Sequence, residues 1–217
     1  MNGYREDRET FRELFWDLFR EGIITLGLND SNRNFPHFSI SRLGHRIIAQ
    51  SNPYFFHDVS SYEKIIRENV PQIDPATLTY LKESMQAFKA GCVLASTIIL
   101  GVAAEHTFML VARAAEQNAA YGAFFERVEK KQWIAGKLEE FKKAMEHKMG
   151  PYIDVETSDG MEAMFNNVQE VLRDFRNKCG HPTGKILSRD MAFVLLQLFI
   201  PYSKKAYELK AFFEKTT

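Results

Sequence analysis

Cysteine is scarce in this 217-residue sequence, which narrows the classes of protein to which the chain can belong. Its two cysteines, Cys92 and Cys179, are far apart, and neither belongs to a CxxC pair. Small secreted domains use many cysteines for disulfides, and structural zinc sites use closely spaced ones. We therefore expect a protein of a reducing compartment, with no metal site and no cofactor.

An excess of positive charge is also missing. The sequence has 28 Lys and Arg residues against 28 Asp and Glu residues, so its formal net charge is zero. A strongly basic surface would by itself have indicated nucleic-acid binding. Any contact with nucleic acid must come from a local patch of basic residues.

Long hydrophobic runs are absent as well. The longest apolar stretch runs from Gly91 to Ala104 and is followed by Glu105 and His106. It is shorter than the roughly 20 residues that a membrane-spanning helix needs, so we expect a buried core helix. The first residues, "MNGYREDRETFREL", are charged rather than apolar, which excludes a signal peptide at this point. We expect a cytoplasmic protein that does not contact a membrane.

Residues 1–50 differ in pattern from the rest of the chain. An amphipathic helix that ends at Gly22 is followed by two short β-like pieces around the turn "NDSNRN", and Ser41 can cap a helix through Gln50. This order resembles the second half of a winged-helix unit. A docking appendage without a DNA role is at least as well supported, because no complete recognition helix is evident. We expect residues 51–73 to be a linker with a short helix.

From Asp74 onward the sequence is helical. Asp74 can cap a helix that has Pro75 in its first turn, and a second helix is expected at 92–117. We expect residues 119–149, rich in Lys and Glu, to form a solvated, protruding helix or helical pair. The large apolar residues expected to face neighbours in the second helix are Leu94, Ile98, Ile99, Val102 and Met109.

The next helix is expected at about 160–179. Its core stripe would contain Phe165, Val168, Leu172 and Phe175. Gly180 suits the left-handed position that commonly follows a helix, and Pro182 prevents continuation.

A last helix, capped by Ser188, should bend at Pro201. These helices predict a mainly α fold, an antiparallel helical bundle preceded by a small α+β segment.

The stretch "RNKCGH" at the end of the expected fourth helix contains a candidate catalytic pair. Arg176 is followed directly by Asn177, and His181 comes five residues after the arginine. An imidazole titrates near neutral pH and can act as a general base or acid, while a guanidinium can bind phosphate through two parallel N–H bonds. The alternative is an ordinary helix end, because short motifs arise by chance.

Two segments together resemble the HEPN superfamily of helical-bundle proteins, whose ribonuclease members carry an Arg-x4–6-His motif. Arg176, Asn177 and His181 match the motif, and "YLKESMQAFKAGCVLASTIILGVAAEHTFML" is similar to the first helical hairpin, including the acidic Glu105. The resemblance covers about residues 74–214. It implies metal-independent cleavage of RNA, a homodimer in which two motifs face one groove, and a toxin or defence setting, in which a regulatory protein partner is possible.

The roles of several neighbouring residues stay open at the level of sequence. Glu105 either orients Arg176 or His181, as the resemblance implies, or is a boundary residue that faces solvent. Lys178 and Lys185 either contact RNA phosphates or are solvated. Two alternative functions also remain: a non-catalytic binding or adaptor module, and a purely structural bundle.

Overall fold

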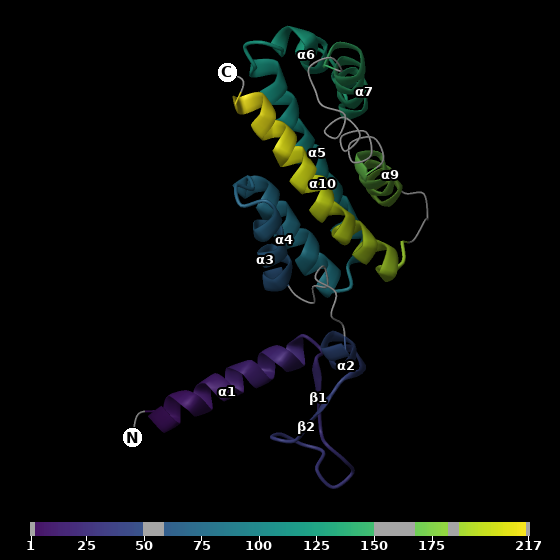
Figure 1. Cartoon of the computed structure of the whole chain (residues 1–217). Coiled ribbons are helices and arrows are strands. Elements are labelled where there is room, and N and C mark those ends of the chain that lie inside the picture. Colours follow the sequence, from purple (N-terminus) through teal and green to yellow (C-terminus); the bar gives the residue numbers. More distant parts are fainter. Residues whose placement is uncertain (1–2, 50–58, 150–167, 182–186, 216–217) are drawn as a thin grey trace. The chain divides into compact units, whose positions relative to one another are not determined.

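The computed structural model describes residues 3–49, 59–149, 168–181 and 187–215 of the chain (Figure 1). Helices account for most of these residues, and one two-stranded sheet is present among them. The prediction of a mainly α fold is therefore confirmed. The chain forms two compact units, Met1–Asp58 and Val59–Thr217.

The first unit consists of two helices and a β-hairpin. Helix α1 spans Gly3–Arg20, strands β1 and β2 span Ile24–Leu26 and Phe38–Ile40, and helix α2 spans Arg42–Ala49. Gly22, with a φ of 69°, ends α1, because a residue with a side chain rarely adopts this backbone conformation.

The hairpin is antiparallel, with Ile24 opposite Ile40 and Leu26 opposite Phe38. Phe15 and Ile24 are the buried hydrophobic residues of the described part of this unit. The Phe15 ring makes edge contacts with the rings of Phe35 and Phe38. Many large apolar side chains of the unit stay exposed, including Trp16, Leu28 and Ile48.

The second unit is a helical bundle around helix α5. This helix packs against α4, α6, α9 and α10, and α10 runs alongside it (Figure 1). The elements of this unit, in chain order, are α3 Val59–Asn69, α4 Pro75–Lys89, α5 Val93–Gln117, α6 Gly122–Glu129, α7 Ile134–Ala144, the π-helical turn η1 Met145–Met149, α9 Gln169–Gly180 and α10 Arg189–Lys215.

Helix α3, in the segment interpreted above as a linker, packs within the bundle against α4 and α10. Tyr62 and Ile66 are buried there. The Tyr62 hydroxyl donates a hydrogen bond of 3.0 Å to the carbonyl oxygen of Leu196 on α10. Burial also raises the pKa of this hydroxyl well above its ordinary value, so it stays protonated and remains a donor. The bundle unit thus begins before Asp74.

The predicted ends of α4 and α5 agree with the structure. The Asp74 side chain accepts hydrogen bonds from the backbone N–H groups of Ala76 and Thr77 at the start of α4. Gly91, with a φ of 79°, separates the two helices. Both features follow from local rules of helix capping, which the sequence records directly.

The predicted buried face of α5 was wrong. Leu94 is exposed and Ile98, Ile99, Val102 and Met109 are only partly buried. The helix instead buries mainly small residues together with Leu100, Phe108 and Val111. Since apolar residues surround this helix, periodicity does not identify the side on which neighbouring helices approach most closely.

Among the described residues, α5 is the one helix long and apolar enough to cross a membrane by length and composition. Its residues Leu100, Ala104 and Phe108 are nevertheless at most 1% exposed within the bundle. The helix therefore forms part of a packed protein core, as expected from the sequence.

The interpretation of residues 119–149 as a solvated, protruding segment was also wrong. Phe125 and Val128 of α6, Leu138 and Phe141 of α7, and Met149 are buried in one hydrophobic cluster with residues of α5 and α10. The outer faces of α6 and α7 carry exposed Lys and Glu residues, which form ion pairs such as Lys143–Glu139. Few apolar residues are enough to fix these helices because each of them is large and fully buried.

Helix α10 closes the bundle. The Ser188 hydroxyl accepts a hydrogen bond of 3.2 Å from the backbone N–H of Met191, as the predicted cap requires. The helix contains Pro201 and continues beyond it to Lys215. Its buried Tyr202 donates a hydrogen bond of 3.0 Å to the carbonyl oxygen of Ala104, which ties α10 to α5 next to Glu105.

Candidate functional site

Helix α9 carries the Arg-Asn-x3-His motif. The described part of this helix begins at Gln169; the residues in front of Val168, including the predicted stripe residue Phe165, lie outside the described residues. Leu172 is 1% exposed and anchors the helix in the core. Phe175 is partly buried.

The predicted left-handed conformation of Gly180 was wrong. Gly180 is the last residue of the helix, and its φ is not positive. The helix ends at His181, whose extended backbone forms the cap and whose N–H donates to the carbonyl oxygen of Asn177 at 3.1 Å. The chain therefore leaves the helical conformation at His181, one residue later than the position of Gly180 predicts.

Arg176 packs closely against α5 because Gly101 has no side chain. A Cβ atom at Gly101 would lie 2.3 Å from the Cβ atom and 2.5 Å from the Cγ atom of Arg176. Such distances are far inside van der Waals contact, so only glycine allows the arginine stem to pass here. The stem packs across α5, while 37% of the side chain stays exposed.

Glu105 lies beside Arg176, one turn further along α5. Its Oε1 atom is 3.7 Å from the Arg176 Nε atom, and only 19% of the glutamate side chain is exposed. Burial raises the pKa of the Glu105 carboxyl above its ordinary value, while the guanidinium groups of Arg176 and Arg173 act in the opposite direction. The structure therefore places Glu105 against the arginine rather than on an outer, solvated face.

Asn177 supports the same arginine from the other side. Its Oδ1 atom accepts a hydrogen bond of 3.0 Å from the Nη1 atom of Arg176. The guanidinium thus has an ion-pair partner on α5 and a hydrogen-bond acceptor on its own helix. Two partners in different directions restrict its orientation.

His181 is exposed at the end of α9. Within the described part of the chain, no hydrogen bond or ion pair joins its side chain to Arg176. The imidazole is exposed to solvent. It lies five positions after Arg176, directly after the last residue of α9, so the two residues are close in sequence.

Lys178 forms an ion pair with Asp174 on its own helix and lies 5.4 Å from the centre of the Phe175 ring. Lys185 lies outside the described residues. Burial raises the pKa of the Cys179 thiol, and its hydrogen bond with Thr97 only partly opposes this effect. A thiol that stays protonated is a poor nucleophile, so Cys179 is not a candidate for nucleophilic catalysis.

The neighbouring His106 takes part in a different contact. Its Nε2 atom lies 3.3 Å from the Oδ1 atom of Asp74, and its ring makes an edge contact with Tyr80. It therefore belongs to the packing of α4 on α5. Among the described residues, no group of three His, Cys, Asp or Glu side chains is arranged to hold a metal ion.

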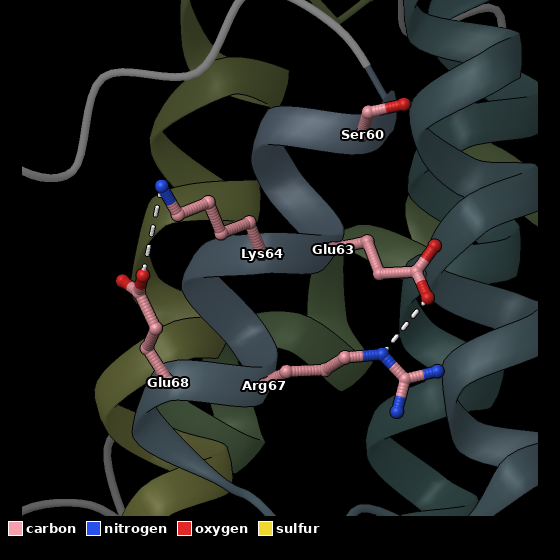
Figure 2. A pocket seen from close by; sticks show the side chains of 5 residues that line it. All are labelled: Ser60, Glu63, Lys64, Arg67 and Glu68. Carbon is pink, nitrogen blue, oxygen red and sulfur yellow. Dashed lines mark hydrogen bonds and ion pairs between the residues drawn. The ribbon is translucent and has the colours of Figure 1, made fainter.

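A shallow surface pocket of about 490 Å³ lies on α3, and none of its lining residues belongs to the motif (Figure 2). Its polar side chains pair along the helix, with Arg67 Nε 2.9 Å from Glu63 Oε1 and Lys64 Nζ 4.0 Å from Glu68 Oε1. Lys82 on α4 also contacts Glu63, at 2.9 Å. Paired, solvated charges of this kind are common on helix surfaces and do not indicate a ligand.

Two residues of the site were missed from the sequence. Gly101 was not recognised as the crossing point of α5 and α9, although a glycine within an apolar helix often marks close packing. The second missed residue is Arg173, three residues before Arg176. The spacing of Arg173 and Arg176, which places both on one face of a helix, was the available signal.

Comparison with family models, with curated proteins and with solved structures finds no match for this chain.

Proposed function

We propose that this protein is a metal-independent RNA endonuclease of HEPN type. The observation that supports it is the arrangement of Arg176, whose stem packs on Gly101 and whose guanidinium lies beside Glu105, while the exposed His181 follows five positions later at the end of the same helix. A purely structural arginine does not need both a glycine opposite its stem and a half-buried carboxylate beside its head. Together these contacts preorganise a cation for binding an anion.

The chemistry requires one proton acceptor, one proton donor and stabilisation of charge on phosphorus. The ribose 2′-oxygen forms a bond to the adjacent phosphorus as the bond from phosphorus to the 5′-oxygen breaks. A base removes the proton of the 2′-hydroxyl, and an acid gives a proton to the departing 5′-oxygen. The products are a 2′,3′-cyclic phosphate and a 5′-hydroxyl.

In this proposal His181 acts as the general base or acid, because its imidazole titrates near neutral pH. Arg176 binds the phosphate and stabilises the charge that develops on its oxygens. Asn177 and Glu105 hold the guanidinium in position. Because the motif supplies one histidine per chain, it suits a homodimer. The partner's His181 then supplies the other proton transfer, as in the family that the motif resembles.

We further propose a cytoplasmic location and a role in a toxin or defence system, where a partner protein would restrain the activity. The low cysteine content supports the first proposal. The family resemblance alone supports the second. Lys178 and Lys185 are proposed as additional contacts to RNA.

The experiment that tests the function is incubation of the purified protein with mixed RNAs in EDTA. We expect cleavage without added metal, and fragments that end in 2′,3′-cyclic phosphate. His181→Ala should be inactive, whereas His37→Ala, which replaces an exposed histidine of the first unit, should be fully active. Strict dependence on magnesium, or full activity of folded His181→Ala, would contradict the proposal.

A second candidate is a non-catalytic binding or adaptor module. It is favoured by the exposed apolar side chains of the first unit, where Trp16, Leu28 and Ile48 are 43%, 59% and 70% exposed. Large apolar side chains left exposed to water can mark a protein interface. Under this alternative the wild-type protein cleaves no RNA in any condition, and its first unit binds another protein.

A further inference from the structure

Helix α9 presents three polar residues at helical spacing, each of which has a buried side-chain atom without a hydrogen bond among the described residues. Gln169 is fully buried, and both polar atoms of its side chain lack a hydrogen-bond partner among the described residues. The Nε atoms of Arg173 and Arg176 are also buried without a hydrogen bond. Residues four and three apart lie on one face of a helix, so these side chains form a polar stripe.

The charge of this stripe is not balanced on α5. Glu105 interacts electrostatically with both Arg173 and Arg176. Within the described part of the chain, Arg173 takes part in no hydrogen bond and no close ion pair, and Glu105 is the acidic residue that faces the two guanidiniums. In the described part of the chain, two positive charges therefore share one negative charge.

An unbalanced positive charge that is partly removed from water costs free energy unless an anion binds to it. Arg173 is partly buried like Arg176, so its stem lies against protein while the end of its guanidinium remains available. Guanidinium groups bind phosphate through parallel N–H bonds with fixed geometry. Two of them, one helical turn apart, suit neighbouring phosphates of a single strand.

We infer that Arg173 and Arg176 form a two-arginine site for the phosphodiester backbone of single-stranded RNA, with Glu105 positioned between them. Arg176 binds the phosphate that is cleaved, and Arg173 binds a neighbouring one. This inference rests on the proposed function and adds a residue and a second phosphate to it. Arg173 is a binding residue, and Glu105 sets the net charge of the site.

The role of Glu105 gives the site an unusual property. If the carboxylate only supported the fold or the position of Arg176, its neutralisation would leave RNA affinity unchanged or lower it. If it balances one of two phosphate-binding arginines, its neutralisation raises the net positive charge of the site. Glu105→Gln should therefore bind RNA more tightly and with a steeper dependence on salt.

The test is fluorescence anisotropy of a short single-stranded RNA whose riboses are all 2′-O-methylated, measured with the full-length protein over a range of salt concentrations. This probe lacks the nucleophile, so binding is measured separately from cleavage. We expect Arg173→Gln to weaken binding about tenfold, as for loss of a charge-assisted contact, and to reduce the salt slope by about 0.7. Arg127→Gln, at an exposed arginine of α6, should change neither.

Each outcome separates this inference from the proposed function. If Arg173→Gln binds like the wild type while the wild type cleaves unmodified RNA, the two-arginine site is refuted and the nuclease remains. If Arg173→Gln weakens binding but no cleavage occurs, the site stands and the nuclease does not. A wild-type protein that does not bind the probe refutes the site. Should Arg173→Gln fold poorly, Arg173→Lys, which keeps the charge without the paired N–H geometry, is expected to bind with intermediate affinity.

Discussion

Gly101 of α5 and Arg176 of α9 meet so closely that a Cβ atom on the glycine would lie 2.3 Å from the Cβ atom of the arginine. The contact is made by the part of the arginine that is fixed to its backbone, so a rotamer change cannot relieve added bulk. The position of the candidate catalytic arginine therefore depends on the separation of two helices. Both the stability of the bundle and the proposed activity should respond to a change at Gly101.

The first prediction concerns this contact. Gly101→Ala should destabilise the protein by about 1–3 kcal/mol, as an overpacked core position does, although alanine favours helix more than glycine. It should also lower RNA cleavage, because Arg176 is displaced from Glu105. The measurements are chemical denaturation and the EDTA cleavage assay.

Gly180→Ala is the matched control for stability. Gly180 lies on the same helix as Arg176, and a Cβ atom there would meet nothing within 4 Å. Its φ is not positive, so alanine should be tolerated or should stabilise the helix by about 0.5–1 kcal/mol. Equal free energies of unfolding for Gly101→Ala and the wild type would show that α5 and α9 can move apart without a loss of stability.

The second prediction distinguishes the two motif residues. His181 is exposed, so His181→Ala should change the free energy of unfolding by less than about 0.5 kcal/mol while cleavage is lost. Arg176→Ala removes a stem that packs on Gly101 and leaves Glu105 without its nearest partner, so we expect a loss of about 1–2 kcal/mol. Thermal melts beside the RNA assay measure both. A His181→Ala protein that is inactive because it unfolds would remove the argument for catalysis.

The third prediction concerns pH. The pKa of Glu105 is raised in the folded protein, mainly by burial, against the attraction of Arg176 and Arg173. A raised pKa means that stability from this group is fully present below its unfolded pKa and is lost as the pH rises through the folded pKa. Glu105→Gln stays neutral, so its stability relative to the wild type should increase as the pH rises through the range in which Glu105 ionises in the folded protein.

Glu139→Gln is the control with the opposite sign. The hydrogen bond with Lys143 lowers the pKa of the exposed Glu139, so its contribution is present at neutral pH and is lost as the pH falls. Its neutral variant should lose a little stability relative to the wild type as the pH rises, and the effect should be small because the pair is solvated. Melting curves with the same slope for both variants would contradict the environment assigned to Glu105.

The fourth prediction concerns assembly. If two chains share one groove, Arg176→Ala and His181→Ala should each be inactive alone, and a mixture of the two proteins should recover part of the activity. Recovery is only partial, because a mixed dimer carries one intact Arg176 and one intact His181, so one of the two proton transfers is still catalysed. Size-exclusion chromatography with light scattering gives the oligomeric state. A monomer, or a mixture that stays inactive, would remove the shared groove and leave a site within one chain.

The fifth prediction tests whether α3 belongs to the bundle. Tyr62→Phe removes the buried hydroxyl that bonds to the Leu196 carbonyl while keeping the ring, so it should cost about 0.5–1.5 kcal/mol. Tyr80→Phe, which changes a partly exposed tyrosine of α4, should cost less. Denaturant midpoints of the two variants compare them directly. If α3 were only a linker, the two substitutions would have equal effects.

The sequence by itself determined the features that depend on local backbone chemistry. Asp74 and Ser188 were recognised as helix caps because an oxygen at this position satisfies N–H groups a few residues away. Gly22 and the antiparallel hairpin after it followed from the same kind of short-range rule. The motif of Arg176, Asn177 and His181 could also be found, because it is continuous on one helix.

Tertiary structure alone decided which surfaces of the helices meet. The buried face of α5 and the packing of α6 and α7 were both predicted wrongly, since a helix that is apolar on several sides does not encode its neighbours. The approach of Arg176 to Gly101 and the sharing of Glu105 with Arg173 also join residues about seventy positions apart. Such contacts arise from the crossing of α5 and α9, and no local pattern contains the distance between two helices.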